Sequence, residues 1–511
     1  MPTEAPALLP LYLQIAARLA QMVVSGAFPA GGRLPSVRDS AANSQVAVAT
    51  VVQAYRHLEE HGVAQPRPKS GYFVVPAGKA KAAKLLRRLQ AAPPPVGADD
   101  DADAPAVTVS FAGYSPKDRD LFDTERIRVA LSRATRLRRD TLIEYTNSSG
   151  SLALRNAVAQ RALHLGCTLD AENIVITTSC ISAISICLQT VTRPGDMVAI
   201  ESPTFFGFLD LLESLNLKAF ELPTDPRSGI SLPALQLALD TQPIKALLLV
   251  PTLSNPLGAV MPLAQKRALA RLVAQYQLPL IEDLVFNDLF ATDARRRAVK
   301  AYDTEGLVMS CGSFAKTVSP GIRIGWVDAG RWSTEVATVK RVQGMSTNAV
   351  LEHALADLLT QSNYEAHLRR LCAQMKLRLG QARKLVQQHF PAGTRSNDPP
   401  AGYALWVELP HGVDGMALFH ACRRHGIAIA PGSLFCASQR YRHFLRLSFA
   451  GALGPQEQAA LAEVGRQACS LVSEGERQKQ EPQTATARPP QADVSRMDLM
   501  FIEEAAAPEL W

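Results

Sequence analysis

The chain has 511 residues, of which 47% are hydrophobic and 20% charged, with a net charge of +7 at pH 7. This balance excludes a wholly disordered chain, and the absence of long apolar runs and of a signal-peptide pattern at the N-terminus predicts a protein that neither spans a membrane nor is exported. Eight cysteines without a CxxC pair predict reduced thiols in the cytoplasm, with no zinc site and no disulfide framework.

Residues 1–77 predict three helices followed by a hairpin. Apolar side chains recur at helical spacing over 11–23, and Ser36 is placed to cap a short second helix. A third helix is predicted over about 46–61, and the alternation over 63–75 predicts two short strands joined by a turn. This order is typical of a winged helix-turn-helix.

The rest of the chain divides by composition into three parts. Residues 78–106 combine a basic stretch, three prolines and an acidic run, which predicts a linker with some helix over 79–91. Residues 107–470 predict one long globular unit. Residues 471–511 are rich in Gln, Glu, Pro and Ala and predict a disordered tail.

The long unit alternates apolar runs with helical stretches. This pattern predicts an α/β fold in which a mostly parallel sheet is covered by helices on both faces. The runs occupy 174–176, 197–200, 246–250, 278–281, 307–309 and 324–327.

A lysine follows one of these runs, which is unusual because lysine is rarely buried without a partner. The Ser-Phe-Ala-Lys segment that ends at Lys316 has the spacing of a serine nucleophile of the penicillin-binding type, but the S-D-N and K-T-G segments of that site are absent. The other interpretation is a lysine that holds pyridoxal 5'-phosphate as a Schiff base, with Ser313 and Arg323 on the phosphate.

Two upstream residues favour the second interpretation. Asp283 ends an apolar run, and a pyridine nitrogen needs a carboxylate partner to stay protonated. Asn255 follows another run and could present its amide to the phenolic oxygen of the cofactor. Together with Lys316 these residues lie at the C-terminal ends of predicted strands, where doubly wound sheets bind their ligands.

These motifs carry a resemblance to known families. Residues 107–470 resemble fold-type I aminotransferases on Asn-Pro-Leu-Gly from 255, Glu-Asp from 282, Ser-Phe-Ala-Lys from 313 and Pro-Gly-Ile-Arg-Ile-Gly-Trp from 320. The N-terminal region resembles a GntR-type winged helix on Leu-Pro-Ser-Val-Arg from 34 and Ser-Gly-Tyr-Phe-Val from 70. The fusion is similar to the MocR family of pyridoxal-phosphate-dependent transcriptional regulators. The resemblance also implies a smaller α+β subdomain.

The resemblance implies a role for each matching position. Lys316 corresponds to the lysine of the internal aldimine, Asp283 to the partner of the pyridine nitrogen and Asn255 to the ligand of the phenolic oxygen. Ser313 and Arg323 correspond to phosphate ligands.

Three further residues complete the implied site. Phe205 corresponds to the aromatic residue that stacks on the pyridine ring, and Arg446 to the clamp for the α-carboxylate of an amino acid. Tyr145 resembles a tyrosine that reaches the phosphate of the neighbouring subunit, which implies a homodimer.

The chain departs from the family pattern at several positions. Phe286 stands where a tyrosine usually bonds the phenolic oxygen, and Phe205 replaces a commoner tyrosine. Ser179 stands at the usual glycine of the phosphate loop and is followed by Cys180, although its hydroxyl and the following helix N-terminus still suit an anion. We therefore expect cofactor binding with weak transamination.

The recognition helix is poor in hydrogen-bond donors, since it begins Val-Ala-Val-Ala-Thr. A base edge is recognised through donors and acceptors, and phosphates through cations or amides. The candidates for contact with duplex DNA are Arg33, Ser36, Arg38, Gln45, Thr50, Gln53, Arg56 and Lys69.

Three functions remain open at this point. The first is a regulator that senses an amino-acid-like effector by aldimine exchange at Lys316. The second is a working aminotransferase with an accessory N-terminal domain. The third is a regulator without its cofactor, against which the presence of Lys316, Asp283 and Arg323 argues.

Overall fold

The structure is a computed structural model that describes residues 11–44, 48–67, 71–90, 105–113, 121–143, 145–290, 294–361, 363–437 and 440–480. The chain divides into two compact units, residues 1–102 and 103–511. Within the described ranges no helix is both long and apolar enough to cross a membrane.

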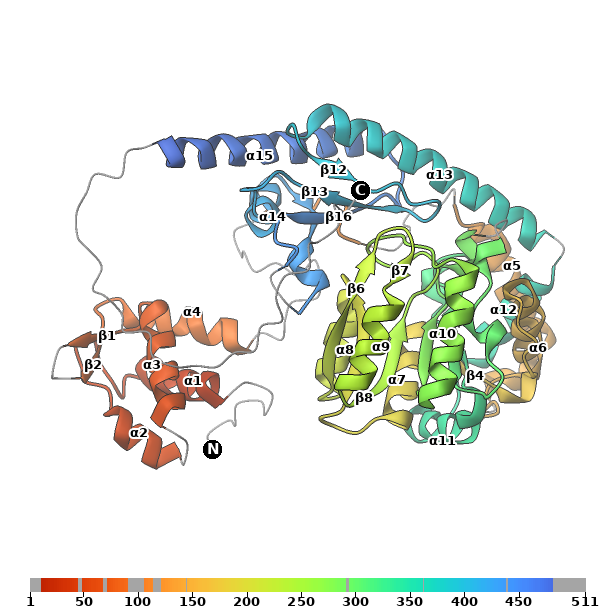
Figure 1. Cartoon of the computed structure of the whole chain (residues 1–511), viewed down its shortest axis with the longest axis horizontal. Coiled ribbons are helices and arrows are strands. Elements are labelled where there is room, and N and C mark those ends of the chain that lie inside the picture. Colours follow the sequence, from red (N-terminus) through yellow and green to blue (C-terminus); the bar gives the residue numbers. More distant parts are fainter. Residues whose placement is uncertain are drawn as a thin grey trace. The chain divides into compact units, whose positions relative to one another are not determined.

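The first unit is the predicted winged helix-turn-helix (Figure 1). The Ser36 hydroxyl accepts a hydrogen bond from the Asp39 backbone N–H at 3.1 Å, so Ser36 caps the second helix as expected. The elements are α1 (Leu11–Val24), α2 (Val37–Ser44), α3 (Val48–Glu60), β1 (Ala64–Arg67), β2 (Gly71–Val74) and α4 (Gly78–Gln90). β1 and β2 pair antiparallel and form the wing.

Helix α4 corrects the predicted boundary at residue 77. Ala82, Leu85 and Leu86 are buried in the same core as the apolar face of α1, so α4 is part of the first unit and not of a linker. Lys79 and Lys81 of the same helix are exposed. The composition of this stretch suggested a linker because α4 contains more basic residues than buried apolar ones.

The second unit is built on an eight-stranded sheet of order β4-β11-β10-β9-β8-β5-β6-β7. The pairs from β10 to β6 are parallel, whereas β11 and β7 run antiparallel to their neighbours. The strands are β4 (Ile174–Thr177), β5 (Met197–Ser202), β6 (Lys218–Asp225), β7 (Gly229–Ile230), β8 (Ile244–Leu249), β9 (Leu280–Asp283), β10 (Val308–Ser313) and β11 (Gly325–Asp328). The half-exposed β6 and the two-residue β7 were not foreseen, because neither is a continuous apolar run.

Both faces of this sheet are covered by helices. On β8, Ala246 and Leu248 belong to the core under α7, while Leu247 and Leu249 belong to the core under α9 and α10. Since successive side chains of a strand point to opposite faces, a strand buried on both sides is apolar throughout. The helices of this part are α5 (Thr124–Leu137), α6 (Leu152–Ala162), α7 (Cys180–Val191), α8 (Phe206–Ser214), α9 (Leu232–Thr241), α10 (Leu263–Tyr276), α11 (Ser333–Gly344) and α12 (Ala349–Thr360).

A smaller α+β part of the second unit contains a four-stranded antiparallel sheet of order β12-β13-β16-β15. Its elements are α13 (Tyr364–His389), β12 (Arg395–Ser396), β13 (Ala404–Glu408), α14 (Gly415–Arg423), β14 (Ile427–Ala428), β15 (Ala430–Pro431), β16 (Phe444–Ser448) and α15 (Pro455–Gln480). The short strand β3 (Val109–Ser110) pairs parallel with β14. Because α15 continues to Gln480 and packs Leu471 and Val472 on the core, the predicted start of the tail at 471 is ten residues too early.

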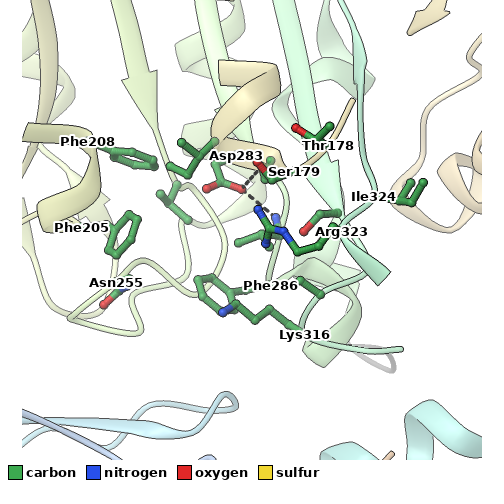
Figure 2. A pocket seen from close by; sticks show the side chains of 16 residues that line it. Thr178, Ser179, Phe205, Phe208, Asn255, Asp283, Phe286, Lys316, Arg323 and Ile324 are labelled. Carbon is green, nitrogen blue, oxygen red and sulfur yellow. Dashed lines mark hydrogen bonds between the residues drawn. The ribbon is translucent and has the colours of Figure 1, made fainter. Parts of the chain in front are cut away.

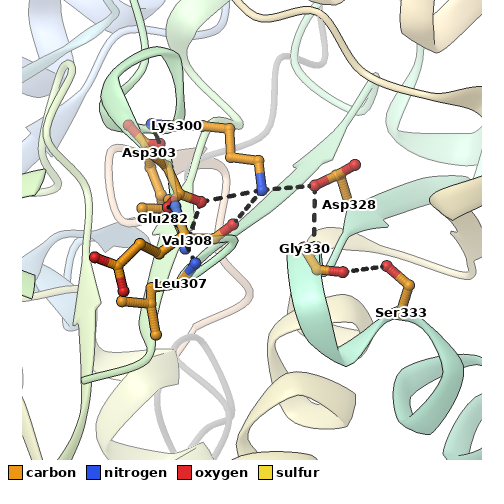
Figure 3. A network of polar contacts seen from close by, with 9 residues as sticks. Glu282, Lys300, Asp303, Leu307, Val308, Asp328, Gly330 and Ser333 are labelled. Atoms are coloured by element: carbon orange, nitrogen blue, oxygen red, sulfur yellow. Dashed lines mark hydrogen bonds and ion pairs between the residues drawn. The ribbon is translucent and has the colours of Figure 1, made fainter. Parts of the chain in front are cut away.

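The two adjacent acids of β9 have separate environments. Glu282 accepts a hydrogen bond from the Lys300 backbone N–H at 3.1 Å in a buried polar network (Figure 3). The Lys300 ammonium donates to the Val308 carbonyl at 2.8 Å and pairs with Asp328 at 2.9 Å and Asp303 at 3.3 Å. The network joins β9, β10 and β11, and strand alternation turns the next residue, Asp283, toward the opposite face.

We predict that Tyr55→Phe destabilises the winged helix by about 1–2 kcal/mol, because it removes a buried hydroxyl that joins α3 to the start of α2. That hydroxyl donates to the Pro35 carbonyl at 2.8 Å and lies 2.9 Å from the Ser40 hydroxyl. Faster amide hydrogen exchange over α3 in the full chain would show the loss. Tyr302→Phe is the control, since among the described residues the Tyr302 hydroxyl has no hydrogen-bonding partner. Equal exchange in the Tyr55 variant and the wild type would contradict the prediction.

Candidate functional site

A cavity of about 180 Å³ lies beyond the carboxyl ends of the parallel strands. Figure 2 shows Phe205 and Asn255 on one side of it and Ser179 and Arg323 on the other. The predicted cofactor residues that line this cavity are Ser179, Cys180, Phe205, Asn255, Asp283, Ser313, Lys316 and Arg323. The tertiary structure therefore brings together residues from segments that are up to 144 positions apart (179 to 323).

Asp283 is the last residue of β9 and is buried. One carboxylate oxygen, Oδ1, accepts hydrogen bonds from the Val285 backbone N–H at 2.8 Å and from the Cys180 thiol at 3.1 Å. Burial raises the pKa of Asp283 to about 6, against the lowering effect of these two donors and of the Lys316 charge. At neutral pH the group is therefore mainly a carboxylate, and the thiol helps to orient it.

Lys316 lies three residues beyond the end of β10. Burial and, to a smaller extent, the positive charge of Arg446 lower the pKa of Lys316 to about 8, against the opposing effect of Asp283. With such a pKa, a much larger fraction of the lysine is in the neutral, nucleophilic form near neutral pH than for an ordinary lysine.

The end of the cavity at α7 can bind an anion. Ser179 caps α7 by accepting a hydrogen bond from the Ser182 N–H at 3.1 Å, so the helix N-terminus points to this end. Arg323 has a left-handed backbone with φ of 53°, which costs energy for a residue with a side chain. A Cβ atom on Gly325 would lie 2.4 Å from the Ser179 carbonyl carbon, so only glycine lets the Arg323 segment approach the helix this closely.

Asn255 and Arg446 are joined at the edge of the site. The guanidinium of Arg446 is fully buried on β16 and donates to Asn255 Oδ1 at 3.3 Å and to the Ala112 carbonyl. Its central carbon lies 5.0 Å from the ring centroid of Phe435 and 5.9 Å from that of Phe206. Since Oδ1 of Asn255 is an acceptor for Arg446, the amide nitrogen of Asn255 is the group that can donate to a ligand.

Two phenylalanines form the apolar walls. A Cβ atom on Gly207 would lie 2.5 Å from the ring of Phe205, so glycine at 207 lets that ring fold back over its own helix toward the cavity. Phe286 also lines the cavity, and its ring contacts Tyr403 edge-on with centroids 6.2 Å apart. Fold-type I aminotransferases usually have a tyrosine at this position. Phe286 has no hydroxyl group and contributes only an apolar ring to the cavity.

The other predicted residues lie elsewhere. The Tyr145 side chain is 84% exposed and is not part of the cavity lining. Arg33 is exposed in a bridge with Phe73 of the wing, and the Ser36 hydroxyl donates to the Asp39 carboxylate at 2.7 Å. Helix α2 carries Arg38, and α3 carries Thr50, Gln53 and Arg56. Gln45 and Lys69 lie outside the described residues.

The sequence did not predict the residues that hold the loop containing Lys316 and Thr317. Tyr364 donates a hydrogen bond to the Thr317 hydroxyl at 3.1 Å, and the His367 ring lies 2.6 Å from the Thr317 carbonyl. Both side chains come from α13, so the helix is anchored to the residue next to Lys316. No local pattern signals this contact, because the two segments are 47 or more residues apart.

Glu201 was also missed. It is buried on β5 and accepts a hydrogen bond from the Val250 N–H at 3.1 Å. Burial and, to a smaller extent, the nearby Asp283 charge raise the pKa of Glu201 to about 8, against the lowering effect of the Val250 hydrogen bond. The signal was available as an acid inside an apolar run, which marks a group with a specific partner.

We predict that Lys316→Met stabilises the cofactor-free protein at pH 7 by up to about 3 kcal/mol. A lysine whose folded-state pKa is about 8 instead of 10.5 destabilises the fold while it is protonated. The gain should therefore be largest below pH 8 and disappear as the pH rises to 10.5. Urea unfolding across this pH range measures it. Lys245→Met, at an exposed position on β8, is the control, and an equal gain in both variants would refute the prediction.

Comparisons with known proteins agree with the fold and the site. The family model "Aminotransferase class I and II" matches residues 113–463, and "Bacterial regulatory proteins, gntR family" matches residues 11–74. The crystal structure of LysN, an alpha-aminoadipate aminotransferase of Thermus thermophilus complexed with N-(5'-phosphopyridoxyl)-L-leucine, is 25% identical with a TM-score of 0.66 and covers 71% of this chain and 93% of its own.

Whole-length relatives share the fusion itself. The HTH-type transcriptional regulator YdcR of Escherichia coli K12 is 35% identical, and YjiR of the same strain is 33% identical. Each comparison covers 89% of this chain and 98% of the relative. The chain therefore belongs to the MocR-type family of transcriptional regulators, which join a GntR helix-turn-helix domain to a fold-type I aminotransferase domain.

Proposed function

We propose that this regulator binds pyridoxal 5'-phosphate at Lys316 and senses an amino acid or a related amine through aldimine exchange there. The observation that carries the proposal is the composition of the cavity. It combines a buried amine, a buried carboxylate, an amide, an aromatic ring and an anion-binding end, which are the groups that this cofactor requires. Relatives in the class I and II aminotransferase family depend on the same cofactor, which supports the proposal.

The residues present fit the cofactor at each of its polar positions. Asp283 would hold the proton on the pyridine nitrogen, and the Asn255 amide would donate to the phenolic oxygen. Phe205 would stack on the ring. The phosphate would lie at the anion-binding end, held by Arg323, Ser313, Ser179 and the Cys180 backbone N–H.

When bound, pyridoxal phosphate supplies an aldehyde that condenses with primary amines and a ring that withdraws electrons. The protein would contribute side chains whose protonation states suit this chemistry. Asp283, with a pKa of about 6, is ionised at neutral pH and suits a protonated pyridine nitrogen. Lys316, with a pKa of about 8, would offer the cofactor's aldehyde a neutral amine more readily than an ordinary lysine would.

A working aminotransferase is the second candidate, and the presence of Lys316, Asp283 and Arg446 favours it. Phe286 weighs against efficient turnover, because it cannot donate the hydrogen bond that helps to set the protonation of the phenolic oxygen. A missing bond of this kind costs about 1 kcal/mol or more, and we expect turnover to lose more than binding does. Sensing therefore fits this site better than catalysis.

The N-terminal unit would bind duplex DNA through α3 and the wing. Arg33 is exposed next to β2, and the sequence of α3 contains Thr50, Gln53 and Arg56. Arg38, Gln45 and Lys69 are the other proposed contacts, whereas the Ser36 hydroxyl is engaged in the helix cap. Cationic contacts of this kind make binding fall steeply with salt, because phosphate neutralisation releases counterions.

We predict that the full chain supplied with pyridoxal phosphate develops a visible absorption band that borohydride fixes to Lys316. Lys316→Ala should remove the band, and Lys340→Ala, at a buried lysine that donates to the Met345 carbonyl, should keep it. Adding an amino acid that binds should shift the band and change the affinity for the protein's own upstream DNA. The proposal fails if no band forms, and rapid conversion of amino donors to keto acids would favour the enzyme instead.

A homodimer is the proposed assembly. Large apolar side chains are exposed near Tyr145, which is unusual for a surface that faces only water. They are Leu137, Leu142, Ile143, Val342 and Met345. The segments that carry Tyr145 and Met345 lie side by side, because the Thr146 hydroxyl donates to the Thr347 carbonyl at 3.4 Å. A second copy could cover these side chains and receive Tyr145 at its phosphate.

We predict that a mixture of Lys316→Ala and Tyr145→Phe protomers regains cofactor binding that neither variant shows at low cofactor concentration. Each mixed dimer would contain one site with both an intact lysine and an intact tyrosine. Absorption after borohydride treatment measures the recovery, and each variant mixed with itself is the control. A monomeric mass at micromolar concentration would contradict the assembly.

A further inference from the structure

The guanidinium of Arg446 is already engaged on both of its arms. Nη1 donates to Asn255 Oδ1 at 3.3 Å, and Nη2 donates to the backbone carbonyl of Ala112. The side chain is fully buried, with the Phe206 and Phe435 rings against its faces. A ligand carboxylate that binds Arg446 through both Nη1 and Nη2 would therefore compete with these protein oxygens for the guanidinium.

Ala112 belongs to a short segment, residues 105–113, that begins the described part of the second unit. In the sequence this segment directly follows residues 91–104, which connect it to the winged helix-turn-helix. The segment is therefore the described part of the second unit that is nearest in sequence to the DNA-binding unit.

Backbone hydrogen bonds and apolar packing hold the segment to the body of the unit, where Val109 and Phe111 are buried in the core. Phe111 N–H donates to the Ala428 carbonyl at 2.7 Å, and the Phe111 carbonyl accepts from Ser448 N–H at 2.8 Å. Thr108 N–H donates to the Gly426 carbonyl at 2.8 Å. The Arg446 contact is the charge-assisted one among these bonds, so its loss should loosen the segment first at Ala112.

We propose that the Ala112 carbonyl is an internal competitor for the effector carboxylate at Arg446, so that carboxylate binding loosens the Ala112 end of residues 105–113. This inference rests on the proposed function in assigning the effector to Arg446. It makes the carboxylate, and not the amino group, the part of the effector that changes the attachment of the segment. An amine without a carboxylate would still take the place of Lys316 on the cofactor's aldehyde carbon, with Lys316 released as the free amine, and would leave the Ala112 contact in place.

The competition at Arg446 also explains why the response would be selective for ligands that carry a carboxylate. Oxygen acceptors are exchanged on a guanidinium that stays buried, so the charge is never left without a partner. The carboxylate brings a full negative charge where the carbonyl brings only a dipole, and it therefore binds more strongly. Neutral ligands gain nothing from the exchange, because they offer no better acceptor than the carbonyl they would replace.

The first test needs no ligand. In the full chain, Arg446→Leu removes both arms, and amide hydrogen exchange over residues 105–113 should accelerate about tenfold or more. Arg446→Lys keeps the charge but has a single donor group, so it should also accelerate exchange and guards against misfolding of the leucine variant. Exchange over β13 checks that the surrounding sheet is intact.

Arg378→Leu is the matched control. Arg378 donates to the Gly451 carbonyl at 2.9 Å and to the Ala450 carbonyl at 3.4 Å, so the variant removes a similar guanidinium–carbonyl contact in the same unit. It should leave exchange over residues 105–113 unchanged. Unchanged exchange in both Arg446 variants, or an equal acceleration in Arg378→Leu, would overturn the proposal.

The second test compares L-leucine with 3-methylbutylamine, which lacks only the carboxylate, on the protein loaded with pyridoxal phosphate. Leucine should shift the absorption band and accelerate exchange over residues 105–113, whereas the amine should at most shift the band. A leucine-dependent shift without faster exchange overturns the competition and leaves the proposed function standing. If neither probe shifts the band, sensing of these ligands at Lys316 is refuted, and the arginine variants decide the competition by themselves.

Discussion

The site depends on one geometric constraint, which is that neighbouring parallel strands all end at the same edge of a sheet. β5, β8, β9 and β10 are parallel neighbours. Asp283 ends β9, and the segments that follow β5, β8 and β10 carry Phe205, Asn255 and Lys316. Residues that are far apart in sequence therefore meet without any direct bond between them. β11 runs the other way, and it brings the Arg323 segment back to the same edge from the opposite direction.

The second requirement is that charges be buried without being left unpaired. Lys316, Asp283 and Arg446 lie in or beside one cavity, and burial shifts the pKa of Lys316 and of Asp283 toward neutrality. Such shifts cost stability and are typical of functional sites. The strand that carries Asp283 is anchored on its other face by the Lys300 network, in which every charge has close partners (Figure 3).

Much of the site could be predicted from the sequence because its residues stand at strand ends, which short motifs mark. Lys316, Asp283 and Asn255 were predicted in this way, and they line one cavity. The partners that orient them could not be predicted. The Cys180 thiol reaches Asp283 from 103 positions away, and Tyr364 reaches Thr317 from 47 positions away, since α7 and α13 pack where their apolar faces require.

The sequence by itself determined the two families, the order of helices and strands, and the chemical types that line the cavity, since all of these follow from local periodicity and short motifs. It misplaced two boundaries, because α4 and the end of α15 bury only a few apolar residues within polar stretches. The tertiary structure alone decided that Glu282 and Asp283 face opposite sides of the sheet with different partners. It also placed a backbone carbonyl of Ala112 on Arg446, a contact across 334 positions that depends on packing and not on side-chain identity.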